Sequence, residues 1–232
     1  MNTLWLPLLW LSGSFLALFL IAELLYRFAH VRAEYTRKLV HACTGLLTLL
    51  FPLFLVEIWQ VLVLCGSFLA LLLLSLRTGW LPSINAVERK TAGSWLYPVI
   101  VSLCFIFYRN MSGVDQPLFG PLYYFYTPLL LLAFCDPVAA LAGGYWRKRH
   151  PETAPGKTFA GSFSFFGLAA IICIASSATF TRHLLPSGYF VATGIAIAYA
   201  TTLVERFSDG GWDNFTIPAA AMLCIWATDY VL

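Results

Sequence analysis

Charged side chains are scarce in this sequence. Of its 232 residues only 11% are Asp, Glu, Lys or Arg, while 60% are hydrophobic; an average soluble domain has about 25% charged residues. So few charges cannot cover a soluble globule, which excludes a cytosolic protein. The net charge of +3 gives no strong basic field, which excludes a nucleic-acid binder. The apolar runs reach the ~20 residues that a bilayer span needs, so the composition predicts an integral membrane protein.

Other missing features narrow the class further. No basic residue and no small-residue cleavage pattern accompany the first apolar run, so we expect a permanent span and not a leader. The six cysteines lie in apolar stretches without a CxxC pair, which predicts reduced, buried thiols in place of disulfides or a zinc site. No polar stretch is long enough for a second, soluble domain. We therefore predict a single polytopic membrane domain over residues 1–232.

The apolar residues fall into eight segments, each of which we expect to be a transmembrane helix. The segments are Leu4–Tyr26, Leu39–Leu55, Ile58–Leu76, Trp95–Tyr108, Leu122–Trp146, Phe159–Phe180, Tyr189–Val204 and Phe215–Leu232. The second and third form one stretch about twice as long as a bilayer core, so we divide it at Pro52 and at the polar point Glu57–Gln60. The predicted fold class is an all-α integral membrane protein with about eight transmembrane helices.

The positions of the basic residues predict the orientation of these helices. Twelve of the fourteen lysines and arginines lie in alternate loops, and only Arg109 and Arg182 lie on the other side. By the positive-inside rule, the basic loops face the cytoplasm and both termini are non-cytoplasmic.

One carboxylate lies inside an apolar segment. An unpaired Asp136 in a bilayer would cost several kcal/mol, so we expect it to face a polar cavity, a cation or a metal. Pro137 follows it and removes a backbone donor, which should open the helix at this point.

A second polar segment contains Gly156-Lys157-Thr158. It is not a P-loop, because Pro151 stands where the Walker motif needs glycine and no strand precedes it. The segment still offers a basic residue and hydroxyl groups at the predicted start of a helix. The free backbone N–H groups of a helix start can bind a phosphate. An ordinary helix cap is the alternative interpretation.

Acidic residues are concentrated in the last cytoplasmic loop. Glu205 and Asp213 lie near the ends of two predicted spans, on a side otherwise rich in cations. Together with Asp136 they supply the carboxylate oxygens that Mg²⁺ prefers. Solvated acids in a turn are the alternative.

Two basic clusters lie in the same set of loops. Arg37 and Lys38 stand at the mouth of a span with His41 one turn inside it, and Arg89 and Lys90 lie in the next cytoplasmic loop. The alternative interpretation is that these basic side chains only extend to the membrane surface and have no role in binding. A histidine at that depth, however, needs a partner or a function.

These clusters share one membrane face, and together they indicate phosphoryl transfer. Basic side chains and helix-start amides can hold a polyphosphate, and carboxylates can hold the Mg²⁺ that accompanies it. Because the loops are short and flanked by spans, the acceptor should come from the lipid phase. The residues therefore predict a lipid hydroxyl that attacks a nucleoside triphosphate.

Five motifs in order, over most of the chain, resemble those of the CTP-dependent polyprenol kinases. This family includes phytol kinase, dolichol kinase and the CTP-dependent diacylglycerol kinase, and it is related to phosphatidate cytidylyltransferases. The motifs are Arg37-Lys38-x-x-His41, Arg89-Lys90-Thr91-x-Gly93, Asp136-Pro137-x-Ala139, Lys157-Thr158-x-x-Gly161-Ser162 and Asp213-Asn214-x-x-Ile217-Pro218. The resemblance implies transfer of the CTP γ-phosphate to an isoprenoid alcohol of the phytol type, with release of CDP.

We accordingly assign roles to individual residues. Mg²⁺ is expected on Asp136, Asp213 and, more weakly, Glu205. The catalytic candidates are Asp136, Lys157 and His41, of which an acid or His41 would take the alcohol proton. The expected nucleotide-binding residues are Arg37, Lys38, Arg89, Lys90, Thr158, Gly161, Ser162 and Asn214.

Three alternatives stay open on the sequence. A CTP-dependent diacylglycerol kinase would use another lipid, and a cytidylyltransferase would release pyrophosphate; the late His-Gly-Gly and Asp-Arg signature of the latter is missing here. A small ion-coupled transporter would line a path with Asp136 and Asp229, but the sequence has no convincing repeat and its polar residues gather on one face. The choice of lipid alcohol and the oligomeric state stay undetermined, and the preference for CTP rests on the resemblance.

Overall fold

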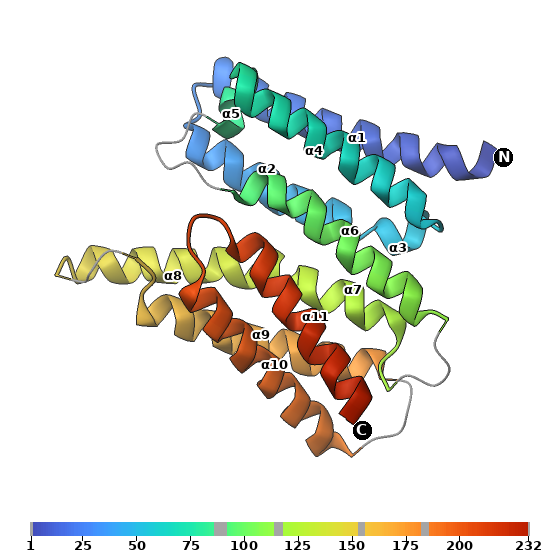
Figure 1. Ribbon diagram of the computed structural model, residues 1–232. Coiled ribbons are helices and arrows are strands. Elements are labelled where there is room, and N and C mark those ends of the chain that lie inside the picture. Colours follow the sequence, from blue (N-terminus) through green and yellow to red (C-terminus); the bar gives the residue numbers. More distant parts are fainter. Residues whose placement is uncertain (1, 86–91, 114–117, 153–155, 182–185, 232) are drawn as a thin grey trace. The chain divides into compact units, whose positions relative to one another are not determined.

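The computed structural model describes residues 2–85, 92–113, 118–152, 156–181 and 186–231, and these residues fold almost entirely into helices (Figure 1). The predicted all-α class is confirmed. The elements are α1 (Asn2–Arg27), α2 (Ala33–Thr48), α3 (Phe51–Phe54), α4 (Ile58–Thr78), α5 (Pro82–Asn85), α6 (Gly93–Met111), α7 (Pro121–Leu130), the π-helix η1 (Leu131–Cys135), α8 (Asp136–Arg149), α9 (Phe159–Phe180), α10 (Ser187–Phe207) and α11 (Asp213–Val231). All six cysteines are free thiols, as expected.

Helices long and apolar enough to cross a bilayer are present throughout the chain, which is therefore a multi-pass membrane protein. Within the described ranges six segments qualify: Leu4–Arg27, Ala33–Phe54, Ile58–Thr78, Pro121–Arg149, Phe159–Phe180 and Gly188–Phe207. The other two predicted spans coincide with α6 and α11, which are helical but not among the six. The count of eight and the location of the termini stay predictions.

The chain divides into two compact units, Met1–Phe105 and Ile106–Leu232. In the first unit, α1 packs against α2, α4 and α5. The predicted break between the second and third spans is confirmed, because α3 ends at Phe54 and α4 begins at Ile58. Glu57 and Gln60 form a capping box there, in which the Gln60 side-chain oxygen accepts the Glu57 N–H at 2.9 Å.

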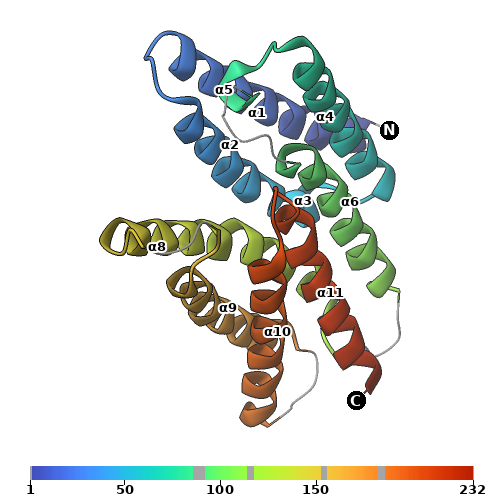
Figure 2. The ribbon, with the colours of Figure 1, turned by 60° about the vertical axis from the view of Figure 1, so that its left-hand side comes forward.

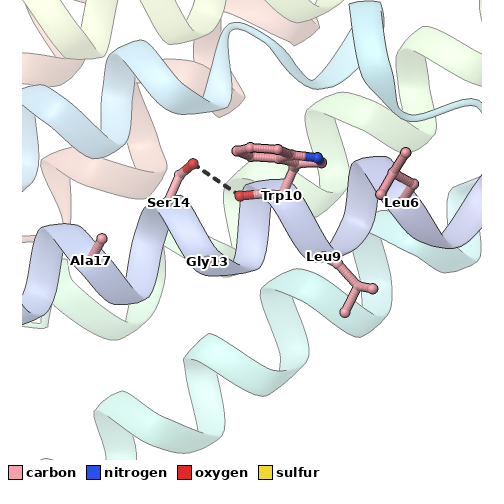
Figure 3. A pocket seen from close by; sticks show the side chains of 6 residues that line it. All are labelled: Leu6, Leu9, Trp10, Gly13, Ser14 and Ala17. Atoms are coloured by element: carbon pink, nitrogen blue, oxygen red, sulfur yellow. Dashed lines mark hydrogen bonds between the residues drawn. The ribbon is translucent and has the colours of Figure 1, made fainter.

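A groove of about 440 Å³ runs along the surface of α1 (Figure 3). Its lining residues all belong to this one helix, and they are Leu6, Leu9, Trp10, Gly13, Ser14 and Ala17. The Ser14 hydroxyl donates to the Trp10 carbonyl at 2.9 Å. The lining offers no charged group that would hold a phosphate, so the site that the sequence predicts must lie elsewhere.

The second unit is a bundle in which α9 lies between α8 and α10, and α10 lies beside α11 (Figure 2). Helix α7 contacts both α9 and α11. The shared core is built from large side chains with at most 1% of their surface exposed, among them Tyr123, Tyr124, Phe165, Ile197 and Ile217. This core fixes the ends of α8, α10 and α11, where the predicted site residues lie.

A polar cluster joins α7, α9 and α11 near the C-terminal end of α11. The Asp229 carboxylate accepts the Phe119 N–H at 3.1 Å and the Tyr124 hydroxyl. The Tyr123 and Ser177 hydroxyls are hydrogen-bonded at 2.7 Å. Asp229 thus ties two helix ends together, at the far end of α11 from Asp213.

Helices α8 and α9 approach each other closely at two glycines. A Cβ atom on Gly161 would lie 2.9 Å from the Ala139 carbonyl oxygen, and one on Gly143 would lie 2.8 Å from the Thr158 hydroxyl. Real Cβ contacts are essentially never this short. The glycines therefore let the start of α9 lie directly against α8, one turn beyond Asp136.

Gly161→Ala should lower the thermal midpoint of the detergent-solubilised protein, because the new methyl group meets a backbone carbonyl that cannot rotate away. Overpacking of this kind costs about 1–3 kcal/mol. Gly167→Ala is the matched control, since it lies in the same helix with nothing within 4 Å of its Cβ position. Equal thermal midpoints for the two variants would refute the close approach.

Candidate functional site

Asp136 stands where the helix changes type. Helix α7 continues through the five-residue π-helix η1 into α8, which begins at Asp136 with Pro137 in its first turn. The expected opening at Pro137 is thus a π-helical turn in a continuous helix, because widening the turn accommodates the missing N–H without breaking the chain. Single π turns within α-helices are frequent at functional sites. The Asp136 side chain is partly exposed.

Lys157 directly precedes α9. Gly156 has φ of +113°, a conformation that favours glycine, and Thr158 caps the helix by accepting the Gly161 N–H on its hydroxyl at 3.1 Å. The Ser162 N–H donates to the Thr158 carbonyl at 3.0 Å. The first N–H groups of a helix have no intrahelical acceptor, so the amides of Phe159 and Ala160 are the ones suited to a phosphate.

The ammonium group of Lys157 lies between two carboxylates. Its Nζ is 2.8 Å from Glu205 Oε1 and 3.3 Å from Asp213 Oδ2. Burial alone would lower the pKa of Lys157, but the hydrogen bond to Glu205 and the charges of Glu205, Asp213 and Asp136 outweigh burial and raise this pKa above its usual value. Lys157 is therefore a fixed cation in an acidic site.

A tight turn brings the two carboxylates together. Glu205 lies at the end of α10 and Asp213 begins α11, and between them Gly210 and Gly211 adopt φ of +66° and +87°. These left-handed conformations are available to glycine at little cost, so the chain reverses within a few residues. The Ser208 and Thr216 hydroxyls, 2.7 Å apart, join the two helices across the turn.

Ser162 holds Glu205 from the other side. Its hydroxyl donates to Glu205 Oε2 at 3.3 Å and accepts a long contact of 3.5 Å from Arg206 Nη1. Glu205 is only 3% exposed, so these contacts and the Lys157 ion pair offset the cost of burying its charge. Arg206 is one of the twelve basic residues on the predicted cytoplasmic side. Its position next to Glu205 in the sequence was the available signal of a second role.

Asp136 belongs to the same electrostatic cluster. The charges of Asp213, Lys157 and Glu205 all act on its carboxyl group. The four predicted site residues come from α8, from the segment before α9, from α10 and from α11, and they lie within electrostatic range of one another. We call Asp136, Lys157, Glu205 and Asp213 the acid–lysine cluster. The cluster contains three carboxyl groups and one ammonium group.

The donor chemistry of this cluster suits magnesium, but its present arrangement does not form a complete metal site. Carboxylate oxygens are the preferred ligands of Mg²⁺. Within the described part of the chain, however, no three His, Cys, Asp or Glu side chains are placed to share an ion. Two of the three carboxylates are instead bound to Lys157.

The remaining predicted residues are distributed as follows. Lys38 and His41 lie on α2 of the first unit, with Lys38 Nζ 3.0 Å from Glu34 and the His41 ring 6.0 Å from that of Tyr97. Arg37 lies on the same helix, and Arg89 and Lys90 fall outside the described residues. The backbone N–H of Asn214 donates to Asp213 Oδ1 at 3.1 Å. The predicted roles of all these residues stay predictions.

Comparison with known proteins identifies the class of enzyme. The chain is 31% identical over 224 residues to a protein named phytol kinase from Synechocystis sp., and the match covers 95% of this chain and 91% of that protein. No family model matches the sequence, and no solved structure matches it. A match of this length shows common ancestry over nearly the whole chain, and it makes this chain a kinase. The chain belongs to the phytol kinase family.

Proposed function

We propose that this protein transfers the γ-phosphate of CTP to a long-chain isoprenoid alcohol of the phytol type, giving the monophosphate and CDP. The observation that carries the proposal is the convergence of Asp136, Lys157, Glu205 and Asp213 at adjoining helix ends of a membrane-embedded kinase. Phosphoryl transfer needs placement and charge neutralisation more than covalent help from the protein. An acid–lysine cluster at helix ends between membrane spans supplies both next to the lipid phase.

Basic and acidic residues have different proposed roles in the reaction. Lys157 and the first amides of α9 hold the β- and γ-phosphates, where the helix dipole also favours an anion. The basic residues Arg37, Lys38, Arg89 and Lys90 neutralise the remaining phosphate charge. The alcohol proton passes to a site carboxylate or to His41; the loose transition state makes few demands on this base. These loops face the cytoplasm, where the nucleotide is.

Mg²⁺ is the proposed cofactor, with Asp136, Asp213 and Glu205 as the residues that would hold it. When bound with the nucleotide, the ion supplies neutralisation of the phosphate charge. The chain's own part is to present carboxylate oxygens and to keep Lys157 within reach of the phosphates.

The transferred group identifies the reaction. With purified protein and CTP labelled at the γ-position, we expect label in the extracted lipid, most of it on phytol when phytol, a polyprenol and diacylglycerol are compared in parallel. Transfer to diacylglycerol instead would reassign the lipid substrate. Lipid labelling from the α-position, with pyrophosphate released, would refute the kinase proposal in favour of cytidylyl transfer.

A further inference from the structure

The Lys157 ammonium occupies the position in which a cation would meet the paired carboxylates. Its Nζ atom lies 2.8 Å from Glu205 and 3.3 Å from Asp213, and only 20% of the Lys157 side chain is exposed. The Glu205 side chain is 4% exposed and Ser162 fixes its second oxygen. Lys157 therefore forms direct, mostly buried ion pairs with the two carboxylates. It does not extend into solvent, as a lysine free to bind a phosphate would.

We infer that Lys157 and a divalent cation compete for the Glu205–Asp213 carboxylate pair, so that the protein binds the metal poorly until a nucleotide polyphosphate draws the lysine away. The inference rests on the proposed function for the identity of the nucleotide and metal. The competition itself concerns only residues of this chain.

Charge balance supports this competition. A buried carboxylate without a counter-ion is costly, so Glu205 and Asp213 keep one cation or the other. Lys157 cannot leave them without a replacement, and a divalent ion cannot approach closely while the ammonium stays. A metal–nucleotide complex removes the conflict, because it delivers a cation to the carboxylates and phosphate oxygens to the lysine together.

Mn²⁺ binding to nucleotide-free protein tests the inference without any turnover. By electron paramagnetic resonance, Lys157→Met should bind Mn²⁺ at least about tenfold more tightly than the wild type, because a unit charge in direct contact with the carboxylates is removed. Lys157→Arg, which keeps the charge, should bind as weakly as the wild type. The double variant Lys157→Met with Glu205→Gln should lose the gain. Equal or weaker Mn²⁺ binding by Lys157→Met would overturn the inference.

A second measurement uses the unaltered protein, in case Lys157→Met fails to fold. Saturating Mn²⁺ should displace the ammonium group and raise the rate at which an amine-acylating reagent modifies Lys157, as read by peptide mass spectrometry. Lys148, exposed at the end of α8, is the internal control and should not change. A rate at Lys157 that Mn²⁺ leaves unchanged would refute the competition. Neither measurement involves phosphoryl transfer, so the competition and the proposed function can fail separately.

Discussion

Asp136→Asn should lower turnover by at least about 100-fold, the loss typical when one charge-stabilising group is removed from an active site. The substitution keeps the shape of the side chain but removes the charge by which Asp136 takes part in the acid–lysine cluster. The thermal midpoint should stay the same or rise, because an amide costs less to bury than a carboxylate and is not repelled by Asp213 and Glu205. Loss of activity in a protein that is no less stable separates a functional role from a structural one.

Asp209→Asn is the matched control for this experiment. Asp209 is exposed in the turn between α10 and α11, close in sequence to Asp213, and the substitution is the same. Its turnover should stay within about twofold of the wild type, as is usual for a surface change. Full activity of Asp136→Asn would remove Asp136 from the reaction and leave the proposed function without its central acid.

Much of the helical architecture could be predicted because apolar runs in a bilayer leave few alternatives to a helix. The predicted segment Phe159–Phe180 has the bounds of α9, where Thr158 caps a run without proline. The division before Ile58 also follows from local chemistry, since the polar pair Glu57 and Gln60 serves as a capping box. In both cases a short-range signal fixes the end of the helix.

Elsewhere the helices extend beyond the apolar signal. Helix α2 begins at Ala33, although the apolar segment begins at Leu39. Its first turns are polar, and the Glu34–Lys38 pair at 3.0 Å follows helical spacing that a search for hydrophobic runs does not detect. Likewise, the π-helical turn before Asp136 depends on how the chain relaxes around Pro137, which the residue order alone does not specify.

The sequence was enough to predict which residues form the candidate site, but not which of their side chains form ion pairs with one another. Asp136, Lys157, Glu205 and Asp213 stand out as charges at span ends. The structure pairs Lys157 with Glu205 and Asp213 and places Asp136 within range of their charges. The sequence assigned the lysine to phosphate and the acids to metal, as separate groups. That Lys157 neutralises two of the acids depends on the Gly210–Gly211 turn and on the packing of α9 against α10, and neither can be read from the local sequence.

Lys157→Ala should reduce turnover to the limit of detection, or raise the nucleotide concentration needed for half-maximal rate by at least about tenfold. Loss of the ammonium removes the side chain that holds the phosphates and leaves Glu205, only 3% exposed, without its ion-pair partner. Initial rates of lipid labelling over a range of nucleotide concentrations measure the effect. The Lys148→Ala control removes an exposed lysine from the end of α8 and should behave as the wild type.

Lys157→Arg separates the loss of phosphate binding from the loss of the ion pair with Glu205. It keeps a positive charge near Glu205 and Asp213, so the thermal midpoint should lie close to that of the wild type. The planar guanidinium does not reproduce the compact ammonium that lies between Glu205 and Asp213, and turnover should stay well below the wild-type rate. Were Lys157→Ala to retain the wild-type rate and nucleotide requirement, the Gly156-Lys157-Thr158 segment would be a helix cap and no more. The phosphate-binding role would then have to pass to the basic residues of the first unit.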